Sequence, residues 1–404
     1  MRAGIGLTSR GWTILGLGIA WCLVAGFIGQ RDLWWPGIFL LLLPLSSLLL
    51  LLPGSHRLRV TRRLDPPRVA AGQSVRVDLL IDPQAVTVAG PTRARDRLAP
   101  ALGEARWHDA PTRLGRWQQR FSYELHPAWR GRHQVGPAER TVADGLGLSM
   151  IRTVVPGTTE LLVTPRVEPL PNLAGASGLG MATDTTLLRT GLGAADDVLI
   201  REYRQGDDVR RVHWRSTART GALMVRREER SWDPSATVLI DNRAAAYSRR
   251  TPDERLEWAV SAAASIAIHL LSDGFDLNLI EADGTVLSPH RATSGRESLV
   301  LEQLADLRTH PVATLGEAFA ASARGAEGQL LIAILGRVDT PDISALSRAR
   351  RQGRTCWAML VGATPELSVA GAELVRAAGW RCAVGGPGVT LADAWRGFDG
   401  GDVR

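Results

Sequence analysis

The residues best suited to chemistry gather in one charged stretch, residues 201–230, which holds nine Arg and five acidic residues. Within it, His213 follows the acidic pair Asp207 and Asp208, a combination that can transfer protons in acid/base catalysis. Clustered Arg side chains also bind phosphate groups, so an anionic ligand is a second possibility. No nucleophile or metal-ligand spacing accompanies His213 in the sequence. Charge density alone therefore does not indicate an active site.

Apolar residues at regular intervals indicate that this stretch is folded and is not a solvated charge run. Val209 and Val212 are three residues apart and can share a helix face, and Gly221 is suited to end that helix. Leu223 and Val225 then alternate as in a strand, which we expect to direct both side chains inward. The charges are either paired within the fold or displayed to a partner, and the sequence leaves both interpretations open.

Composition describes a chain of 404 residues with 45% apolar content, enough for two or three domains with buried cores. The net charge is +7, but there is no Lys, so the basicity is most simply a genomic composition effect. The acids nearly balance the Arg in the charged stretch and there is no Gly-rich phosphate loop, so we expect no nucleic-acid partner. Cys22, Cys356 and Cys382 form no disulfide framework, which is typical of a reducing compartment.

Two uncharged apolar runs open the chain, at residues 11–29 and 34–52. Each approaches the roughly 20 residues that a helix needs to cross a bilayer. A cleaved signal peptide or buried soluble helices explain the pair less well, because a second Leu-rich run follows almost at once. The sequence therefore predicts a two-helix transmembrane hairpin that contacts the lipid bilayer through residues 11–52.

The placement of basic residues predicts the orientation of this hairpin. Arg2 and Arg10 precede it, and the turn between the runs is charge-balanced. Basic residues also follow it: His56, Arg57, Arg59, Arg62 and Arg63. By the positive-inside rule, both chain ends then lie in the cytoplasm and the protein is anchored in the plasma membrane. The opposite orientation of the hairpin would instead indicate a cell-envelope protein whose body lies outside the cytoplasm.

Residues 56–166 alternate apolar and polar side chains with period two, interrupted by Gly and Pro turn signals. The alternating apolar positions are Val75, Val77, Leu79, Ile81, Phe121, Tyr123 and Leu125. Short strands of this kind predict a small antiparallel β-sandwich. Its histidines, His108, His126 and His133, are scattered without catalytic spacing. We expect a spacer or interaction domain.

After a Gly-, Ala- and Thr-rich loop at residues 168–196 and the charged stretch, the pattern changes to alternating strands and helices. The first strand is expected at residues 236–241 and ends in Asp241, and a helix at residues 253–272 follows. Uninterrupted apolar strands predict an α/β domain with a doubly wound, mostly parallel sheet. Ligands of such sheets bind at the carboxyl ends of the strands, where Asp241 and the 336–339 turn are expected.

The charged stretch resembles the signature of a known family, the domain of unknown function 58 family. The matching residues are Arg201, Glu202, Tyr203, Gly206, Asp207, Asp208, Arg210, His213, Trp214, Arg219 and Gly221. Residues 130–137, 144–148 and 163–167 are similar to further stretches of the family. In residues 144–148 the Pro-Phe pair of the family is replaced by Gly145 and Leu146.

The resemblance implies two amino-terminal membrane helices, a β-rich region and a von Willebrand factor A-like carboxyl-terminal domain. It also implies a MoxR-type AAA+ ATPase partner and other members of a membrane complex, with no assigned activity and no cofactor. Type A domains normally bind a metal ion through Asp-x-Ser-x-Ser. Here that position reads Asp241-Asn242-Arg243-Ala244-Ala245, so both serines are missing. An Arg at the site repels a divalent cation, and we expect a degenerate site in which Asp241 pairs with Arg243 or with a helix amino terminus.

The sequence therefore predicts four segments: a transmembrane hairpin at 1–55, a sandwich at 56–166, a loop with the signature at 167–235 and an α/β domain at 236–404. The leading hypothesis is a non-enzymatic, membrane-anchored adaptor that engages a cytoplasmic ATPase. The alternative is an enzyme or sensor that binds an anionic ligand at the Arg-rich stretch.

Overall fold

The computed structural model describes residues 2–51, 58–83, 91–110, 119–172, 199–202, 214–227, 235–247, 252–287, 295–324, 330–351, 354–362 and 365–399. The chain forms two compact units. The first comprises Met1–Arg166 with Leu301–Leu307, and the second comprises Val167–Val300 with Arg308–Arg404.

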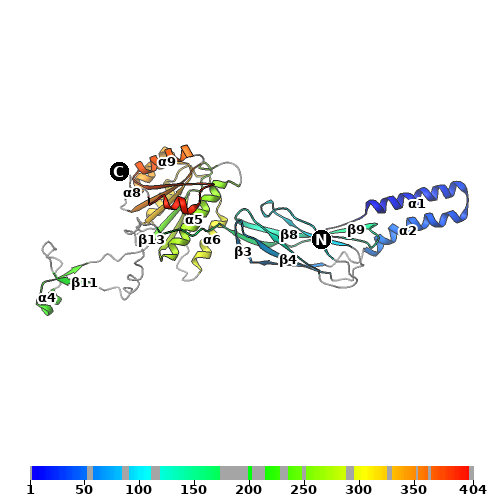
Figure 1. Cartoon of the computed structure of the whole chain (residues 1–404), viewed down its shortest axis with the longest axis horizontal. Helices are drawn as coiled ribbons and strands as arrows, with labels where there is room; N and C mark the ends of the chain where they lie inside the picture. Colours follow the sequence, from blue (N-terminus) through cyan, green and yellow to red (C-terminus); the bar gives the residue numbers. More distant parts are fainter. Residues whose placement is uncertain are drawn as a thin grey trace. The chain divides into compact units, whose positions relative to one another are not determined.

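The first unit begins with a strand and a helical hairpin (Figure 1). Strand β1 (Arg2–Leu7) leads into α1 (Ser9–Ile28), and a 3₁₀ turn η1 (Arg31–Leu33) leads into α2 (Trp34–Leu51). The side chain of Thr8 caps α1, which ends at Gly29 with a φ of 75°. Both helices are long and apolar enough to cross a membrane, with a hydropathy of 1.9 over each span. The two predicted apolar helices are confirmed as helices.

Small residues let these two helices approach closely, as in many membrane helix pairs. A Cβ on Gly37 would lie 2.5 Å from the Cys22 sulfur, and one on Gly18 would lie 3.0 Å from the Leu41 side chain. The hairpin is thus a packed pair and not two independent helices.

The rest of the first unit contains two sheets. An antiparallel sheet has the order β2 (Leu58–Asp65), β4 (Val75–Pro83), β7 (Gln119–Leu125). The larger sheet runs β1-β9-β8-β10-β3, with β5 paired to β8 and β6 paired to β5. Its remaining strands are β3 (Arg68–Ala70), β5 (Thr92–Leu98), β6 (His108–Ala110), β8 (Gly131–Ala143), β9 (Ser149–Val155) and β10 (Thr159–Thr164). A short 3₁₀ turn, η3 (Pro100–Leu102), follows β5.

The two sheets share apolar cores, as the period-two pattern predicts. Val75, Val77, Leu79 and Ile81 of β4 are all at most 1% exposed and pack against residues of β8, β9 and β10. One detail of the prediction is wrong: the sandwich is not wholly antiparallel, because β10 and β3 pair in parallel. Strand β1, which also joins this sheet, was not predicted from the sequence.

The second unit contains a five-stranded parallel sheet in the order β14-β13-β15-β16-β17. Its strands are β13 (Ser235–Ile240), β14 (Asp276–Glu281), β15 (Leu330–Leu335), β16 (Thr355–Val361) and β17 (Arg381–Gly385). Its helices are α5 (Glu254–Ser272), α6 (Arg296–Asp306, shared with the first unit), α7 (Gly316–Arg324), α8 (Thr340–Arg350), α9 (Pro365–Ala377) and α10 (Leu391–Arg396). The predicted mixed α/β class with a parallel sheet is confirmed.

The burial of the sheet strands explains why their positions could be predicted from the sequence. Every residue of β13 and β15 is buried, as expected of central strands covered on both faces. Helices α7, α8 and α9 pack on the sheet face that carries Leu239 and Leu331, and α5 also packs on the sheet. Asp253 caps α5 by accepting from the Arg255 amide, as its position after Pro252 predicted.

Candidate functional site

The carboxyl edge of the parallel sheet is organised around Asp241, which directly follows β13 and is fully buried. Its Oδ1 accepts hydrogen bonds from Nε of Arg243 at 2.9 Å and from the Arg243 backbone amide at 3.1 Å. Its Oδ2 accepts from Nη2 of Arg243 at 3.0 Å and from the Gly336 amide at 3.1 Å. The Asp241–Arg243 pair expected from the sequence is therefore present.

The Arg243 guanidinium reaches further than the sequence indicated. Its Nη1 donates to both carboxylate oxygens of Asp342, at 3.1 and 3.0 Å, and to the Ala313 carbonyl at 3.1 Å. Its Nη2 also donates to the Arg337 carbonyl at 3.0 Å. The side chains of Arg243, Asp241 and Asp342 are 3%, 0% and 1% exposed, so the whole cluster is shielded from water.

For both Arg243 and Asp241, burial and ion pairing shift the pKa in opposite directions. Burial lowers the pKa of Arg243, but the hydrogen bonds and charges of Asp241 and Asp342 outweigh it and hold that pKa above its ordinary value. Burial raises the pKa of Asp241, while the hydrogen bonds from Arg243 and Gly336 oppose the rise. An internal guanidinium between two carboxylates satisfies their charge without any external ion.

These residues do not fit the metal ion that a type A domain would imply. A hard divalent cation takes oxygen ligands, and the oxygens of Asp241, Asp342, Ala313 and Arg337 here surround a positive guanidinium instead. Arg243 occupies the third position of the motif, where a serine hydroxyl would be needed. The cation at this edge belongs to the chain itself.

A second polar group lies beside this cluster on the same edge. Asn242 donates to Glu281 at 2.6 Å and to the Arg308 carbonyl at 2.8 Å, and it accepts from the Ala282 amide at 3.0 Å. Burial raises the pKa of Glu281, while the hydrogen bond from Asn242 opposes the rise. Asn242 thus ties β13 to the end of β14. Within the described residues, no group of three or more His, Cys, Asp or Glu side chains is arranged to hold a metal ion.

The described part of the signature stretch is a short antiparallel pair with a helix between its strands. Strand β11 (Leu199–Glu202) pairs with β12 (Met224–Arg227), so that Arg201 lies opposite Val225. Helix α4 (Trp214–Thr220) ends at Gly221. Gly221 has a φ of 71°, and its backbone amide donates a hydrogen bond to the Thr217 carbonyl, which terminates the helix. The predicted helix end at Gly221 and the strand after it are confirmed.

The apolar side chains of this stretch do not all turn inward. Trp214, the first residue of α4, is 72% exposed. Leu223 is 44% exposed, so the expectation that it points inward is wrong. The reason is local: Leu223 lies one residue before β12 begins, where the alternation of strand faces does not yet apply.

Signature residues fall into two groups. Arg201 and Glu202 lie in β11, Trp214 and Arg219 lie in α4, and Gly221 follows that helix. The other predicted site residues lie outside the described residues: Tyr203, Gly206, Asp207, Asp208, Arg210 and His213. Their proposed proton-transfer or ion-pairing roles stay predictions, as does the character of the loop at 173–196.

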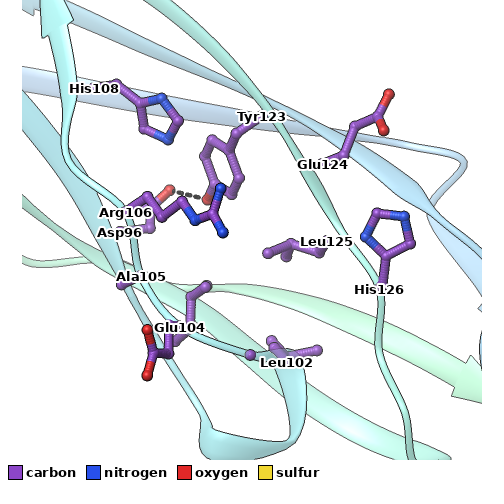
Figure 2. A pocket seen from close by; sticks show the side chains of 12 residues that line it. Asp96, Leu102, Glu104, Ala105, Arg106, His108, Tyr123, Glu124, Leu125 and His126 are labelled. Carbon is purple, nitrogen blue, oxygen red and sulfur yellow. Dashed lines mark hydrogen bonds between the residues drawn. The ribbon is translucent and has the colours of Figure 1, made fainter.

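The sandwich contains a hollow that the sequence did not indicate (Figure 2). About 680 Å³ in volume, it is lined by groups from β5, β6, β7 and the loop after β5. At its wall the Tyr123 hydroxyl donates to Asp96 at 2.7 Å, and Arg62 donates to the same carboxylate at 2.6 Å. The His108 ring stacks on Tyr123 with centroids 5.3 Å apart. Burial, followed by the charge of Asp96, raises the pKa of Tyr123.

This hollow brings together two of the scattered histidines, His108 and His126. Asp96 already accepts hydrogen bonds from Arg62 and Tyr123, so both of its carboxylate oxygens are engaged within the fold. Sequence spacing could not find the group, because its members come from strands and loops that only the fold brings together.

Comparison with known proteins finds a family match for part of the chain. Residues 199–329 match the family described as "Protein of unknown function DUF58". Uncharacterised proteins of Mycobacterium tuberculosis (strain ATCC 25618 / H37Rv) and Mycobacterium bovis are 33% identical over 134 residues. That match covers 33% of this chain and 39% of each relative, so the chain spans well under half the length of the curated relatives it matches.

Solved structures resemble parts of the chain weakly. The VWA domain of SpRpn10 has a TM-score of 0.30 and 16% identity, covering 40% of this chain and 94% of that domain. The CARDB domain of the PF1109 protein from Pyrococcus furiosus has a TM-score of 0.16 and 12% identity, covering 25% and 88%.

Proposed function

We propose that this chain, whose residues 199–329 match the family described as "Protein of unknown function DUF58", is a membrane-anchored adaptor. The hairpin α1–α2 anchors it in the plasma membrane with both chain ends in the cytoplasm. Its cytoplasmic body binds a protein partner through the segment β11–α4–β12. The partner class is a MoxR-type AAA+ ATPase, with other members of a membrane complex.

The exposure of Trp214 is the observation that carries this proposal. Trp214 has 72% of its surface exposed, and Trp and Arg are the residues that most often dominate the energetics of protein interfaces. Within α4 no residue is buried, so the helix face is available to a partner. Arg215 and Arg219 follow Trp214 on the same short helix and are also exposed.

The carboxyl edge of the sheet supports an adaptor over an enzyme. We assign this sheet to a von Willebrand factor A-like domain, because its first strand β13 is an interior strand and is directly followed by the buried Asp241. Arg243 fills the position of an activating cation and is itself held by six side-chain hydrogen bonds to Asp241, Asp342 and two carbonyls. A network whose donors and acceptors are already paired has little left with which to bind or activate a substrate.

Retention of the ATPase by the solubilised full-length protein tests the proposal. We expect wild-type protein to retain a MoxR-type ATPase of the same organism, and Trp214→Ala to weaken the affinity by about 30-fold, as for a hot-spot residue. Trp107→Ala is the matched control, since Trp107 is a second partly exposed Trp in a different domain. Wild-type protein that retains no ATPase would sink the proposal, and so would a Trp107→Ala variant that loses binding while Trp214→Ala keeps it.

A second function, as a sensor or enzyme for an anionic ligand, has one specific observation in its favour. Arg215 and Arg219 are exposed and lie four residues apart on α4, so both guanidinium groups can bind the same phosphate. Thermal shift of the full chain with inorganic phosphate, nucleotides and phosphosugars tests it. Stabilisation by millimolar ligand that is lost in Arg219→Ala supports this alternative, and no stabilisation excludes it.

A further inference from the structure

The turn at residues 144–148, between β8 and β9, packs against both helices of the hairpin. On the α1 side, the Thr8 hydroxyl donates to the Gly147 carbonyl at 2.6 Å, and the Thr8 amide donates to the Leu148 carbonyl at 2.9 Å. A Cβ on Gly11, in the first turn of α1, would lie only 2.1 Å from that Leu148 oxygen. The turn and the start of α1 are therefore in direct contact.

The same turn also holds α2. The buried carboxylate of Asp144 accepts a hydrogen bond from the Ser47 hydroxyl and another from the Ser149 amide at 3.2 Å. The Ser149 hydroxyl in turn donates to the Pro44 carbonyl at 3.4 Å. Ser47 lies four residues before the end of α2, so the turn reaches about 6 Å along this helix from its end.

The lengths of α1 and α2 determine how deep the turn at residues 144–148 lies relative to the bilayer. Helix α1 has 20 residues and α2 has 18. At 1.5 Å per residue these are about 30 and 27 Å long, no longer than the roughly 30 Å hydrocarbon core of a bilayer. If both helices span the membrane, no helical turn is left over to lift Gly11 and Ser47 clear of the lipid. Groups that touch them lie at the level of the headgroups or just inside it.

The side chains at this level are suited to a lipid interface. Leu146, at the tip of the turn, is 62% exposed, and Met150, at the start of β9, is 39% exposed. Trp12, one residue beyond Gly11 on α1, is 63% exposed and has the amphipathic character of interfacial aromatic residues. Arg10 is exposed, and its guanidinium lies 3.9 Å from where a Cβ on Gly147 would stand. It can therefore attract anionic headgroups.

We propose that the turn at residues 144–148 is a third membrane contact, in which Leu146 inserts into the interface of the bilayer beside the hairpin. The occupant of this apolar surface is phospholipid. The surface is continuous with the lipid-facing helices, and its apolar tip lies beside Arg10 in the way that interfacial segments combine the two chemistries. The inference rests on the membrane anchoring of the proposed function and adds a lipid-binding role for the sandwich.

A fluorophore attached at single cysteines of the full-length protein in lipid vesicles tests this. The background is Cys22→Ala; Cys356 and Cys382 are buried at 4% and 5% exposure and react poorly. Leu146→Cys and Met150→Cys report on the turn. Leu17→Cys, 61% exposed on α1, reports on the hairpin itself. The vesicles contain phosphatidylcholine and phosphatidylglycerol, with or without spin-labelled lipid, which carries the quencher either near the headgroup, to reach the turn, or on the acyl chain, to reach residue 17.

Gln73→Cys is the matched soluble control. It is exposed and lies near Thr164, because the Ala71 amide donates to the Thr164 carbonyl. Strand β8 pairs near residue 143 with the start of β9 and near residue 131 with the end of β10. The 13 residues of β8 therefore separate Gln73 from the turn by about 40 Å, at roughly 3.3 Å per residue.

We expect the spin-labelled lipid to quench the labels at residues 146 and 17 by about twofold or more and to leave the label at residue 73 unchanged. Quenching at residue 17 without quenching at 146 and 150 overturns this inference and leaves the anchor intact. A label at residue 17 that is not quenched overturns the anchor itself, and the inference with it. A blue-shifted but unquenched label at 146 would mean that protein, such as a second copy of the chain, covers Leu146, and it too overturns the inference.

Discussion

Arg243 and Asp342 lie 99 positions apart in the sequence, yet the Arg243 Nη1 donates to both oxygens of the Asp342 carboxylate, at 3.1 and 3.0 Å. Asp342 is also the N3 residue of α8 and accepts from the Asp339 amide at 3.1 Å, completing a capping box. Asp342 therefore also caps the amino terminus of α8. Through one guanidinium, the loop after β13 is tied to the start of α8.

Removing the guanidinium should be costly. Arg243→Ala leaves the buried carboxylates of Asp241 and Asp342 without their counter-charge, and we expect it to lower the free energy of unfolding by about 3–5 kcal/mol. Arg243→Lys keeps the charge but cannot reproduce the fork geometry, so we expect a smaller loss. Urea denaturation of the full-length protein in detergent measures both. A loss below about 1 kcal/mol for Arg243→Ala would show that the cluster contributes little.

Metal dependence should appear only when Arg243 is removed. We expect neither Mg²⁺ nor a chelator to change the Tm of the wild-type protein, because the guanidinium lies between the two carboxylates. Arg243→Ser vacates that position and leaves oxygens of Asp241, Asp342, Ala313 and Arg337, which suit a hard cation. Ca²⁺ or Mg²⁺ at 100 times its Kd would then stabilise the variant by about 2.7 kcal/mol. A wild-type Tm that rises with Mg²⁺ would contradict this account, as would a folded Arg243→Ser protein that does not respond.

The sequence anticipated this cluster only where its members are local. Asp241 and Arg243 are two residues apart, so their pairing could be read from the motif. Asp342 looks like any acidic residue in the first turn of a helix, and nothing in the sequence connects it with Arg243. Long-range partners of this kind depend on the strand order, which brings the loop after β13 next to the loop after β15.

The same distinction holds for the fold. The apolar strand β13 and the capped helix α5 were located to within about two residues, because burial and capping leave local signals. Strand β1 was missed because its six residues, Arg2–Leu7, contain two Gly and join the sheet only through β9. Helix α10 was missed because six residues are too few to show a helical period, although Trp395 near its end is fully buried.

Stability should depend on pH through Glu139. Burial raises its pKa, but hydrogen bonds from Arg152, Arg95 and Arg97 outweigh burial and hold the pKa at about 2, below the ordinary 4.5. A depressed pKa in the folded state contributes stability that is fully present above pH 4.5 and is lost as the pH falls from 4.5 towards 2. We therefore expect Glu139→Gln to lower the Tm at pH 7 by about 3–6 °C.

The difference in Tm between wild type and Glu139→Gln should shrink between pH 4.5 and pH 2, because the wild-type carboxylate is then protonated too. Asp109→Asn is the control: Asp109 pairs with Arg93 on the surface, with side chains 71% and 63% exposed, and should contribute almost nothing. A Tm difference for Glu139→Gln that stays constant over this range would mean that the residue acts through packing and not through its charge.

The contact between the hairpin and the sandwich can be tested by adding one methyl group. In Gly11→Ala the new Cβ would meet the carbonyl oxygen of Leu148 at 2.1 Å and its carbon at 3.0 Å, both backbone atoms that cannot rotate away. The helix must therefore shift and weaken the Thr8–Leu148 hydrogen bond, at a cost of about 1–3 kcal/mol. Gly16→Ala is the matched control on the same helix, because a Cβ there meets nothing within 4 Å. Ala is also the better helix former, so we expect Gly16→Ala to be neutral or slightly stabilising. Thermal unfolding of both variants in detergent measures this effect. Equal Tm values would mean that the first turn of α1 does not pack against the turn at residues 144–148.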